Sequence, residues 1–396
     1  MRQKADSVTI RPPQRACHAG QPGTTTIHYS PFMIHNGGTM GFETFLGNPQ
    51  AVSVVRDMLG SGRLPGALLF AGPDGVGKKT LALMLAKALN CERRRDDFCG
   101  ECRHCRKAEE MLAAAREDLE RRRQMKDSVR RAEGLVYFDL QLIEPITRYI
   151  LIEQVRQLRN IAYTRPFELR RRVLIVDQAQ AVHWQAVDLL LKVLEEPPDT
   201  TTLILVCPNA FELRSTIRSR CSQLQFVPVE EAVIANLLEK EGRVNTARRA
   251  VAVRAVAGSI AKAKTFDPAE FERRRKPWID FFDAVGRAGK AADIDWRALF
   301  DSTKALTEDR EIFEETLSMG YSLLRDLVYV LESKEDGRVT HVDLLPRFKA
   351  WAPRLGLPGL ETLKEGLDEA YRSQIRNANQ QLGLEALAID LLTRAG

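Results

Sequence analysis

The feature that most constrains this chain is an apolar run that leads directly into a glycine-rich loop and then into an amphipathic helix. Residues 66–90 read "GALLFAGPDGVGKKTLALMLAKALN" and contain the pattern G-x-x-x-x-G-K. In that context, backbone N–H groups and the positive end of a helix bind phosphate. The stretch predicts a nucleotide-binding loop on an α/β sheet, with phosphates held by Gly72, Gly75, Gly77 and Lys78.

The residue after Lys78 departs from this pattern. A Ser or Thr normally stands there, because its hydroxyl helps to hold Mg²⁺. This chain has Lys79 instead, and Thr80 follows one place late. One residue turns a helix by about 100°, so the Thr80 hydroxyl should point elsewhere, while Lys79 brings positive charge towards the metal position. The loop allows ATP or ADP as a cofactor but disfavours Mg²⁺.

Two further apolar runs predict strands, "RRVLIVDQAQAV" at residues 171–182 and "TTLILVCP" at residues 201–208. Strands that alternate with helices indicate a parallel sheet. Asp177 ends the first of these strands, where an acid that holds metal is expected. Gln178 follows in place of the Glu that would polarise an attacking water. Gln orients water but is a far poorer base, so a second catalytic element is also defective.

The strand patterns stop beyond Val227, and the remainder reads as helices. We predict an N-terminal extension at residues 1–39, a sheet module at 40–226, a small helical lid at 227–265 and an all-helical domain at 266–396. The extension is rich in Gly, Pro, Thr and Gln and lacks both periodicity and an apolar segment. We therefore expect it to be disordered and not a signal peptide. Met33 and Met40 are candidate alternative starts.

Four of the seven cysteines fall within fifteen residues, in the pattern C-x₇-C-x₂-C-x₂-C. They are Cys91, Cys99, Cys102 and Cys105. Four thiolates at such spacing suit tetrahedral Zn²⁺ in a closed structural site, within an insert at residues 91–107. An iron–sulfur cluster is the alternative, although no Cys-Pro follows. The other three cysteines, Cys17, Cys207 and Cys221, have no such neighbours and are given no role.

A charged helical pattern at residues 108–133 follows the insert. Glu117 with Arg121 and Asp118 with Arg122 are favourable pairs at i,i+4. Its apolar stripe is thin, so we interpret it as a solvated helical arm, with an arginine-rich nucleic-acid contact as the less favoured alternative.

The composition narrows the class of protein. A chain of 396 residues with 44% hydrophobic and 28% charged residues has enough apolar side chains for two or three globular domains. No apolar run reaches membrane-spanning length, so we expect a cytoplasmic protein with no membrane partner. The net charge of +6 permits anionic partners without requiring them.

Two more motifs carry a resemblance to a known family. "LLLKVLEEPP" at residues 189–198 and "TIRSRC" at residues 216–221, with the cysteine insert and the helical tail, resemble clamp-loader subunits of bacterial DNA polymerase III. The resemblance runs from residue 41 to the end. It implies an AAA+ ATPase module, a helical lid and a C-terminal collar domain. It also implies a hetero-pentameric ring with gamma/tau and delta subunits that opens the sliding clamp and places it on primed DNA.

Within that family, the gamma or tau motor has an intact loop and an Asp-Glu pair, whereas delta-prime often has eroded versions of both. Lys79 and Gln178 therefore favour a delta-prime-like stator with little ATPase of its own. The resemblance then implies that Arg220 acts as an arginine finger on the γ-phosphate of a neighbouring subunit. The alternatives are a gamma-type motor, an unrelated P-loop enzyme with a zinc knuckle and, for Arg220 alone, a surface salt bridge.

Other positions depart from the family pattern. The lid arginine expected near "AGS" is Ala261 or Lys262, and the sensor strand ends at Pro208 and Asn209. "VYFDLQLIEP" stands where His-Pro-Asp often follows the insert, and the charged arm is longer than the family implies. These departures agree with a silent nucleotide site.

Overall fold

The computed structural model describes residues 41–125, 138–242, 244–287, 295–309, 312–332, 338–375 and 379–394. The predicted extension at residues 1–39, with Cys17 and Met33, lies outside this part of the chain, as do residues 126–133 of the charged arm.

A five-stranded parallel sheet forms the first domain, with the strand order β2-β3-β4-β1-β5. The strands are β1 (Ala67–Ala71), β2 (Leu140–Ile143), β3 (Arg172–Val176), β4 (Thr201–Cys207) and β5 (Ser222–Gln225). The four strands from β2 to β1 are buried along their whole length, as apolar parallel strands covered on both faces should be. The parallel α/β sheet predicted from the sequence is confirmed.

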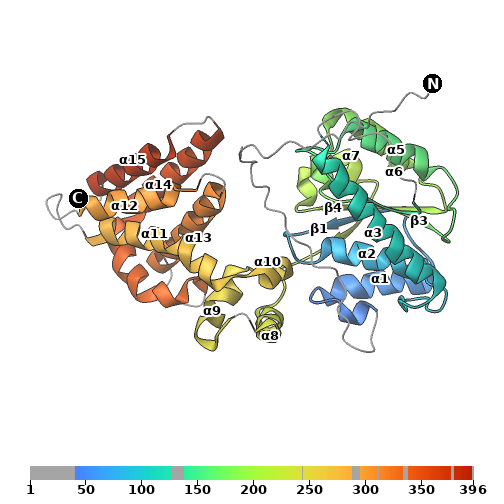
Figure 1. The fold of residues 1–396 in the computed structure, drawn as a ribbon, viewed down its shortest axis with the longest axis horizontal. Helices are drawn as coiled ribbons and strands as arrows, with labels where there is room; N and C mark the ends of the chain where they lie inside the picture. The colour runs from blue at the N-terminus through green and yellow to red at the C-terminus, as the bar shows by residue number, and fades with distance from the viewer. Residues whose placement is uncertain are drawn as a thin grey trace, which may run out of the picture.

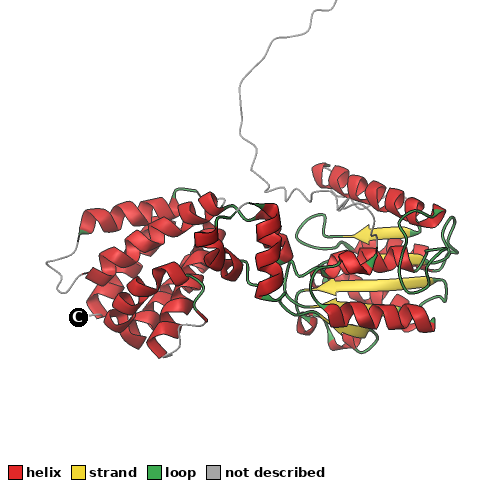
Figure 2. Cartoon of the chain, turned by 90° about the horizontal axis from the view of Figure 1, so that it is seen from below, coloured by secondary structure: helices red, strands yellow, loops and turns green. Residues whose placement is uncertain are grey.

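Helices cover both faces of the sheet (Figure 2). One face packs against α1 (Pro49–Ser61), α2 (Lys78–Ala88) and α3 (Arg103–Gln124). The other face packs against α5 (Ile152–Ala162) and α6 (Val187–Glu195). Alternate residues of β1 supply the two cores, with Leu68 and Phe70 on the first face and Leu69 on the second. The short helix α7 (Ser215–Arg218) leads into β5.

Several single-turn 3₁₀ helices connect these elements. They are η1 (Phe42–Thr44) before α1, η2 (Ala179–Ala181) and η3 (Trp184–Ala186) after β3, and η4 (Ala210–Glu212) after β4.

Three small helices follow the sheet: α8 (Glu231–Glu241), α9 (Thr246–Ala255) and α10 (Ile260–Thr265). Their apolar side chains, among them Ile234, Leu238 and Val253, belong to the same core as the first face of the sheet. In Figure 1 these helices lie between the sheet and the C-terminal helices. The lid is thus packed against the sheet module and forms no separate core.

The C-terminal helices have a core of their own. They are α11 (Pro268–Arg287), α12 (Trp296–Thr307), α13 (Phe313–Glu332), η7 (Val342–Leu344), α14 (Leu345–Ile375) and α15 (Gln380–Arg394). Trp278 is fully buried there and donates its indole N–H to the carbonyl oxygen of Thr316 at 2.8 Å. Gly320 permits this packing, because a Cβ at that position would lie 2.6 Å from the indole ring. None of the helices that the structure describes is long and apolar enough to cross a membrane.

Candidate nucleotide-binding loop, cysteine cluster and interface arginine

The glycine-rich loop lies between β1 and α2, at the carboxyl edge of the sheet. Gly72, Gly75 and Gly77 have φ values of 150°, 77° and 102°, which side chains rarely adopt. A Cβ on Gly72 would also lie 2.4 Å from the backbone oxygen of Phe226. The loop therefore has the strand–loop–helix geometry that the sequence predicts, and its glycines are needed for it.

The loop lysine contacts the loop itself. Lys78 is 6% exposed, and its ammonium donates to the carbonyl oxygens of Gly72 and Pro73 at 2.5 and 2.6 Å. Asp74 lies 3.5 Å away. Burial lowers the pKa of Lys78, and the neighbouring Asp74 carboxylate partly opposes this. The ammonium therefore remains at the mouth of the phosphate loop, held by groups that a phosphate would replace.

Lys79 joins the ends of two neighbouring strands. Its ammonium forms an ion pair with Glu144, just after β2, and lies 3.3 Å from the Oδ2 atom of Asp177, just after β3. Arg123, from the end of α3, binds the other oxygen of Glu144 at 2.8 Å. Burial raises the pKa of Asp177, and the charge of Lys79 opposes that rise. The carboxylates of Glu144, which is buried, and Asp177, which is half-buried, are thus paired with cations of the chain itself.

This arrangement does not fit Mg²⁺. The ion requires near-octahedral oxygen ligands and is usually held by a carboxylate together with the loop hydroxyl. Here an ammonium, which offers no acceptor, lies between the carboxylates of Glu144 and Asp177 that follow β2 and β3. Thr80 is half-buried on the first turn of α2, one position beyond the place where the hydroxyl is required.

Gln178 and Asn209 stand where an ATPase site usually has a water-activating glutamate and a polar sensor. In this chain the Gln178 side chain is exposed to solvent and the Asn209 side chain binds its own segment. Gln178 is exposed, has a left-handed φ of 54°, and its backbone N–H binds the Asp177 carboxylate at 3.0 Å. The side-chain oxygen of Asn209 accepts the backbone N–H of Phe211 at 3.0 Å and so caps η4. The contacts of these two side chains therefore do not show either one in the role of the missing glutamate or of a residue that senses the γ-phosphate.

The lid rests directly on the phosphate loop, a contact that sequence reasoning missed. The backbone N–H of Ala261 donates to the carbonyl oxygen of Gly75 at 3.1 Å. A Cβ on Gly75 would lie 2.0 Å from the hydroxyl oxygen of Ser259. Ser259 also caps α10 by accepting the N–H of Lys262 at 3.2 Å. The sequence "AGSIAK" carries the signal for this contact, since a Ser N-cap follows a glycine there.

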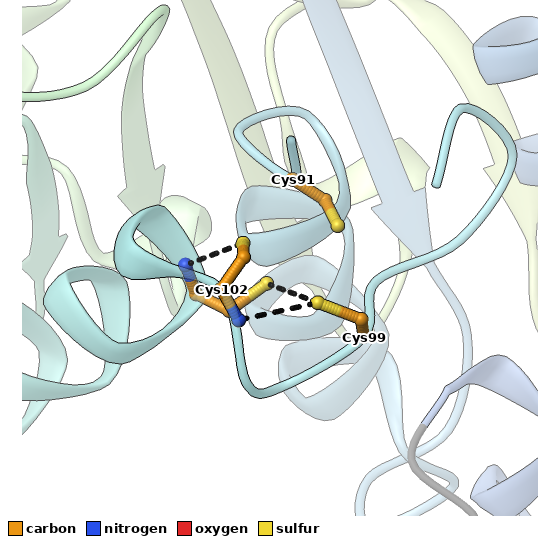
Figure 3. A group of neighbouring side chains, drawn as sticks. Cys91, Cys99 and Cys102 are labelled. Carbon is orange, nitrogen blue, oxygen red and sulfur yellow. Dashed lines mark hydrogen bonds between the residues drawn. The ribbon is translucent and has the colours of Figure 1, made fainter. Parts of the chain in front are cut away.

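The four clustered cysteines lie together, and Figure 3 shows how Cys91, Cys99 and Cys102 face one another. Their sulfur atoms all lie within 4.8 Å of one another. Cys91 and Cys99 lie in the loop after α2, Cys102 is the N-cap of α3, and Cys105 is in the first turn of α3. The Cys99 sulfur accepts the N–H of Cys102 at 3.3 Å, and the Cys102 sulfur accepts the N–H of Cys105 at 3.4 Å. Four thiols in this arrangement fit a tetrahedral Zn²⁺ and leave no open coordination position.

Arg220 follows α7 and lies at the surface. Its guanidinium binds Oε1 of Glu195 at 2.9 Å and donates to the carbonyl oxygen of Thr216 at 2.9 Å. Glu195 is the last residue of α6 and belongs to "LEEPP", so the two motifs that carry the family resemblance meet here. The Arg220 and Glu195 side chains are 36% and 49% exposed.

Arg220 is far from the chain's own phosphate loop. In the parallel pairing of β1 with β5, Leu68 lies opposite Ser222, and Ala71 lies opposite Gln225. Arg220 precedes β5, near the start of β1, whereas the phosphate loop follows the last residue of β1. At about 3.3 Å per residue, the separation along the sheet is about 20 Å. Arg220 therefore cannot contact a nucleotide in its own loop.

The similarity of this chain to known proteins extends well beyond the motifs at residues 189–198 and 216–221. Residues 47–230 match the family described as "DNA polymerase III, delta subunit". The delta-prime subunit of Bacillus subtilis is 24% identical over 348 residues, which are 87% of this chain and 95% of that protein. The gamma subunit of Buchnera aphidicola from Acyrthosiphon pisum is 27% identical over 199 residues, 50% of this chain. The tau subunit of Escherichia coli is 29% identical over the same share of this chain.

The lengths covered differ among these relatives. The match spans 48% of the length of the Buchnera gamma subunit, which is about half. It spans 27% of the length of the Escherichia coli tau subunit. A gamma-subunit-related structure from Thermotoga maritima is 14% identical, covers 87% of this chain and all of that one, and has a TM-score of 0.43. That superposition is too weak to define the fold, which rests on the sheet described above. From its sequence matches, the chain belongs to the family of DNA polymerase III clamp-loader subunits.

Proposed function

We propose that this chain is a delta-prime-like stator of the clamp loader, with negligible ATPase of its own. The observation that carries this proposal is the Lys79 ammonium between Asp177 and Glu144. The subunit would assemble with gamma/tau and delta subunits in the cytoplasm and help to place the sliding clamp on primed DNA. Similarity to the Bacillus subtilis delta-prime subunit over most of both chains supports this assignment.

The nucleotide site lacks two catalytic elements. Lys79 replaces the hydroxyl that helps to hold Mg²⁺, and Gln178 replaces the base that would activate water. Separating Lys79 from two partly buried carboxylates leaves charges without partners, which is costly in a low-dielectric interior. Gly72, Gly75, Gly77 and Lys78 can still bind the phosphates of ATP or ADP, because the backbone geometry of the loop is retained.

Arg220 would act on the neighbouring subunit. It lies about 20 Å from its own loop, so only a nucleotide bound by another subunit is within reach. Its present partner, Glu195, is an exposed carboxylate, and exposed ion pairs contribute only about 0–1 kcal/mol. A γ-phosphate carries more charge and matches the planar guanidinium fork better than this single carboxylate contact. The exchange of partners is therefore energetically accessible.

Cys91, Cys99, Cys102 and Cys105 would hold one Zn²⁺ in a structural role. Bound zinc would cross-link the end of α2 to the start of α3. Three of these thiols are buried and pack with the first-face core, so the cross-link would stabilise the sheet module. Metal analysis should find about one zinc per chain, and bound iron with sulfide would contradict this assignment.

The test of the proposed function compares the isolated chain with the reconstituted loader. The isolated chain should show no ATP turnover above background, with or without Mg²⁺, clamp and primed DNA. It should co-purify with gamma/tau and delta subunits and raise the ATPase rate of the mixture. The gamma-type motor is retained as a second candidate because Gly72, Gly77 and Lys78 are intact. Turnover by the isolated chain that a Lys78→Ala variant abolishes would establish that alternative.

A further inference from the structure

An exposed aromatic residue lies beside α7. Phe211, in η4, is 82% exposed. The guanidinium carbon of Arg218, at the end of α7, lies 4.7 Å from the centroid of its ring. Among the ion pairs of the described residues, Arg218 has no carboxylate partner, so the N–H edge of its guanidinium remains available to another molecule.

The pair of Phe211 and Arg218 has the properties of a protein–protein anchor. A large apolar ring in water gains free energy when a partner covers it. A guanidinium over a ring face is attracted to the ring and keeps N–H donors for other partners. Because both side chains already contact each other, less conformational freedom is lost on docking. Arginine and aromatic residues are also enriched among the side chains that dominate binding energy at interfaces.

Arginines predominate on the surface around the pair of Phe211 and Arg218. Arg214, Arg218 and Arg220 are at least partly exposed within seven residues, and the acids beside them are Glu212 and Glu195. Arg220 is engaged by Glu195, but Arg214 and Arg218 make no ion pair among the described residues. This face therefore complements an acidic surface with an apolar contact at its centre.

The position of the pair identifies the partner. Arg218 and Arg220 are two residues apart, so their Cα atoms lie within about 7 Å of each other. If Arg220 reaches the nucleotide of the neighbouring subunit, as the proposed function requires, that subunit must also cover the ground beside it. We propose that Phe211 and Arg218 are the anchor through which this chain docks on the ATP-binding module of the neighbouring loader subunit. Phe211 would enter an apolar contact, and Arg218 would bind an acidic side chain.

The experiment measures how tightly the full chain binds the remaining loader subunits, gamma/tau and delta, in solution. Phe211→Ala should weaken this binding about 10- to 100-fold, as expected for a hot-spot residue. Arg218→Ala should weaken it to a similar extent. Arg218→Lys should restore only part of the affinity, because lysine keeps the charge but loses the flat stack.

Phe167 provides a matched control. It is 75% exposed and also lies near an arginine, with the Arg172 guanidinium carbon 5.8 Å from its ring centroid. Arg172, however, is buried and already paired with Asp139. Phe167→Ala should therefore bind the other subunits with an affinity within about twofold of the unaltered chain. Each variant is also checked for zinc content and thermal unfolding, so that a folding defect is recognised.

The outcomes separate this inference from the proposed function. If Phe211→Ala and Arg218→Ala, correctly folded, bind as tightly as the unaltered chain, the docking anchor is refuted while the stator function stands. Equal weakening by Phe167→Ala would also refute it, because the effect would then belong to exposed aromatic rings in general. If the unaltered chain does not bind the loader subunits at all, the proposed function itself fails.

Discussion

Two arginine–carboxylate pairs of almost equal length occupy opposite environments in this molecule. Arg172 and Asp139 are 3.0 Å apart inside the sheet module and are 1% and 0% exposed. Arg220 and Glu195 are 2.9 Å apart at the surface and are 36% and 49% exposed. The first pair is closed to other molecules, whereas the second is open to solvent. Distance alone therefore does not reveal which pair supports the fold and which is available for function.

The surroundings of the buried pair explain the difference. Asp139 accepts the backbone N–H groups of Phe167, Glu168 and Leu169, and Arg172 donates to the carbonyl oxygens of Ile161 and Arg165. Both charged groups are thus held by the end of α5 and the loop between α5 and β3, and only the Nε atom of Arg172 lacks a hydrogen-bond partner within this pair. Arg220 has one exposed carboxylate and short-range contacts within its own segment. The ion pairs of Lys79 resemble the buried pair, since both of its partners, Glu144 and Asp177, lie inside the same domain.

The largest effect should come from Arg220→Ala. Catalysis at the one neighbouring ATP site should fall about 10³- to 10⁵-fold, because an arginine finger stabilises charge in the transition state. The ATP turnover of the whole loader should fall by the fraction that this one site contributes. The zinc content and thermal unfolding of the chain should stay unchanged. Steady-state ATP hydrolysis by the reconstituted loader measures this.

Arg220→Lys is the matched control for geometry. It retains the charge without the planar fork and should restore little activity. A loader with Arg220→Ala that hydrolyses ATP and loads clamps at the normal rate would show that Arg220 is only a surface charge.

The second effect concerns the buried pair. Asp139→Asn should lower the free energy of unfolding by about 3–5 kcal/mol, because it leaves the Arg172 charge buried without its partner. Urea or thermal unfolding of the isolated chain measures the change. Glu195→Asn is a suitable comparison, since it removes the carboxylate of the exposed pair instead. A similar loss of stability in both variants would contradict the distinction drawn between the pairs.

The same variant should change the pH dependence of stability. Burial raises the pKa of Asp139, but the backbone N–H donors and Arg172 more than offset it, so the pKa lies below its usual value of 3.8. The stabilisation is therefore present above pH 3.8 and is lost as the pH falls through the lower pKa of the folded state. Asp139→Asn should flatten the acid limb of the stability curve.

A third, smaller effect should follow from converting an internal ion pair into a metal site. The double variant Lys79→Ser/Gln178→Glu supplies the missing hydroxyl and the missing base. It should raise Mg²⁺-dependent ATP turnover of the isolated chain about 10- to 100-fold above background, which reaches only the lower end of the roughly 10²- to 10⁴-fold that a general base contributes. Adding Lys78→Ala should remove this gain. Unchanged turnover in a folded double variant would mean that other features, such as the docked lid, keep the site inactive.

The sequence predicted those features that are local in the chain. The strand, loop and helix at residues 66–90 are contiguous, and the four clustered cysteines fall within fifteen residues, so their motifs are visible without a fold. The parallel sheet is confirmed, and so is the proximity of the four sulfur atoms. The roles of the individual nucleotide-site residues and of Arg220 stay predictions.

Long-range contacts were not predictable from the same patterns. The strands β2, "LQLI", and β5, "SQLQ", are short and contain polar residues, so neither run carries a clear strand signal. Lys79 and Glu144 are 65 positions apart, and the sequence gives no reason to join them until β2 is placed beside β3.

The smallest effect should come from Glu195→Gln, and it tests whether the exposed pair is exchangeable. Loss of an exposed ion pair should change the free energy of unfolding by about 0–1 kcal/mol. If Glu195 only occupies Arg220 until a phosphate replaces it, the ATPase rate of the loader should stay the same or rise slightly. Removing the carboxylate takes away a competitor for the guanidinium and nothing that the transition state needs. If Glu195→Gln instead lowers the rate as far as Arg220→Ala does, Glu195 is required to position the guanidinium. The surface pair would then resemble the buried one, in that both depend on a fixed partner.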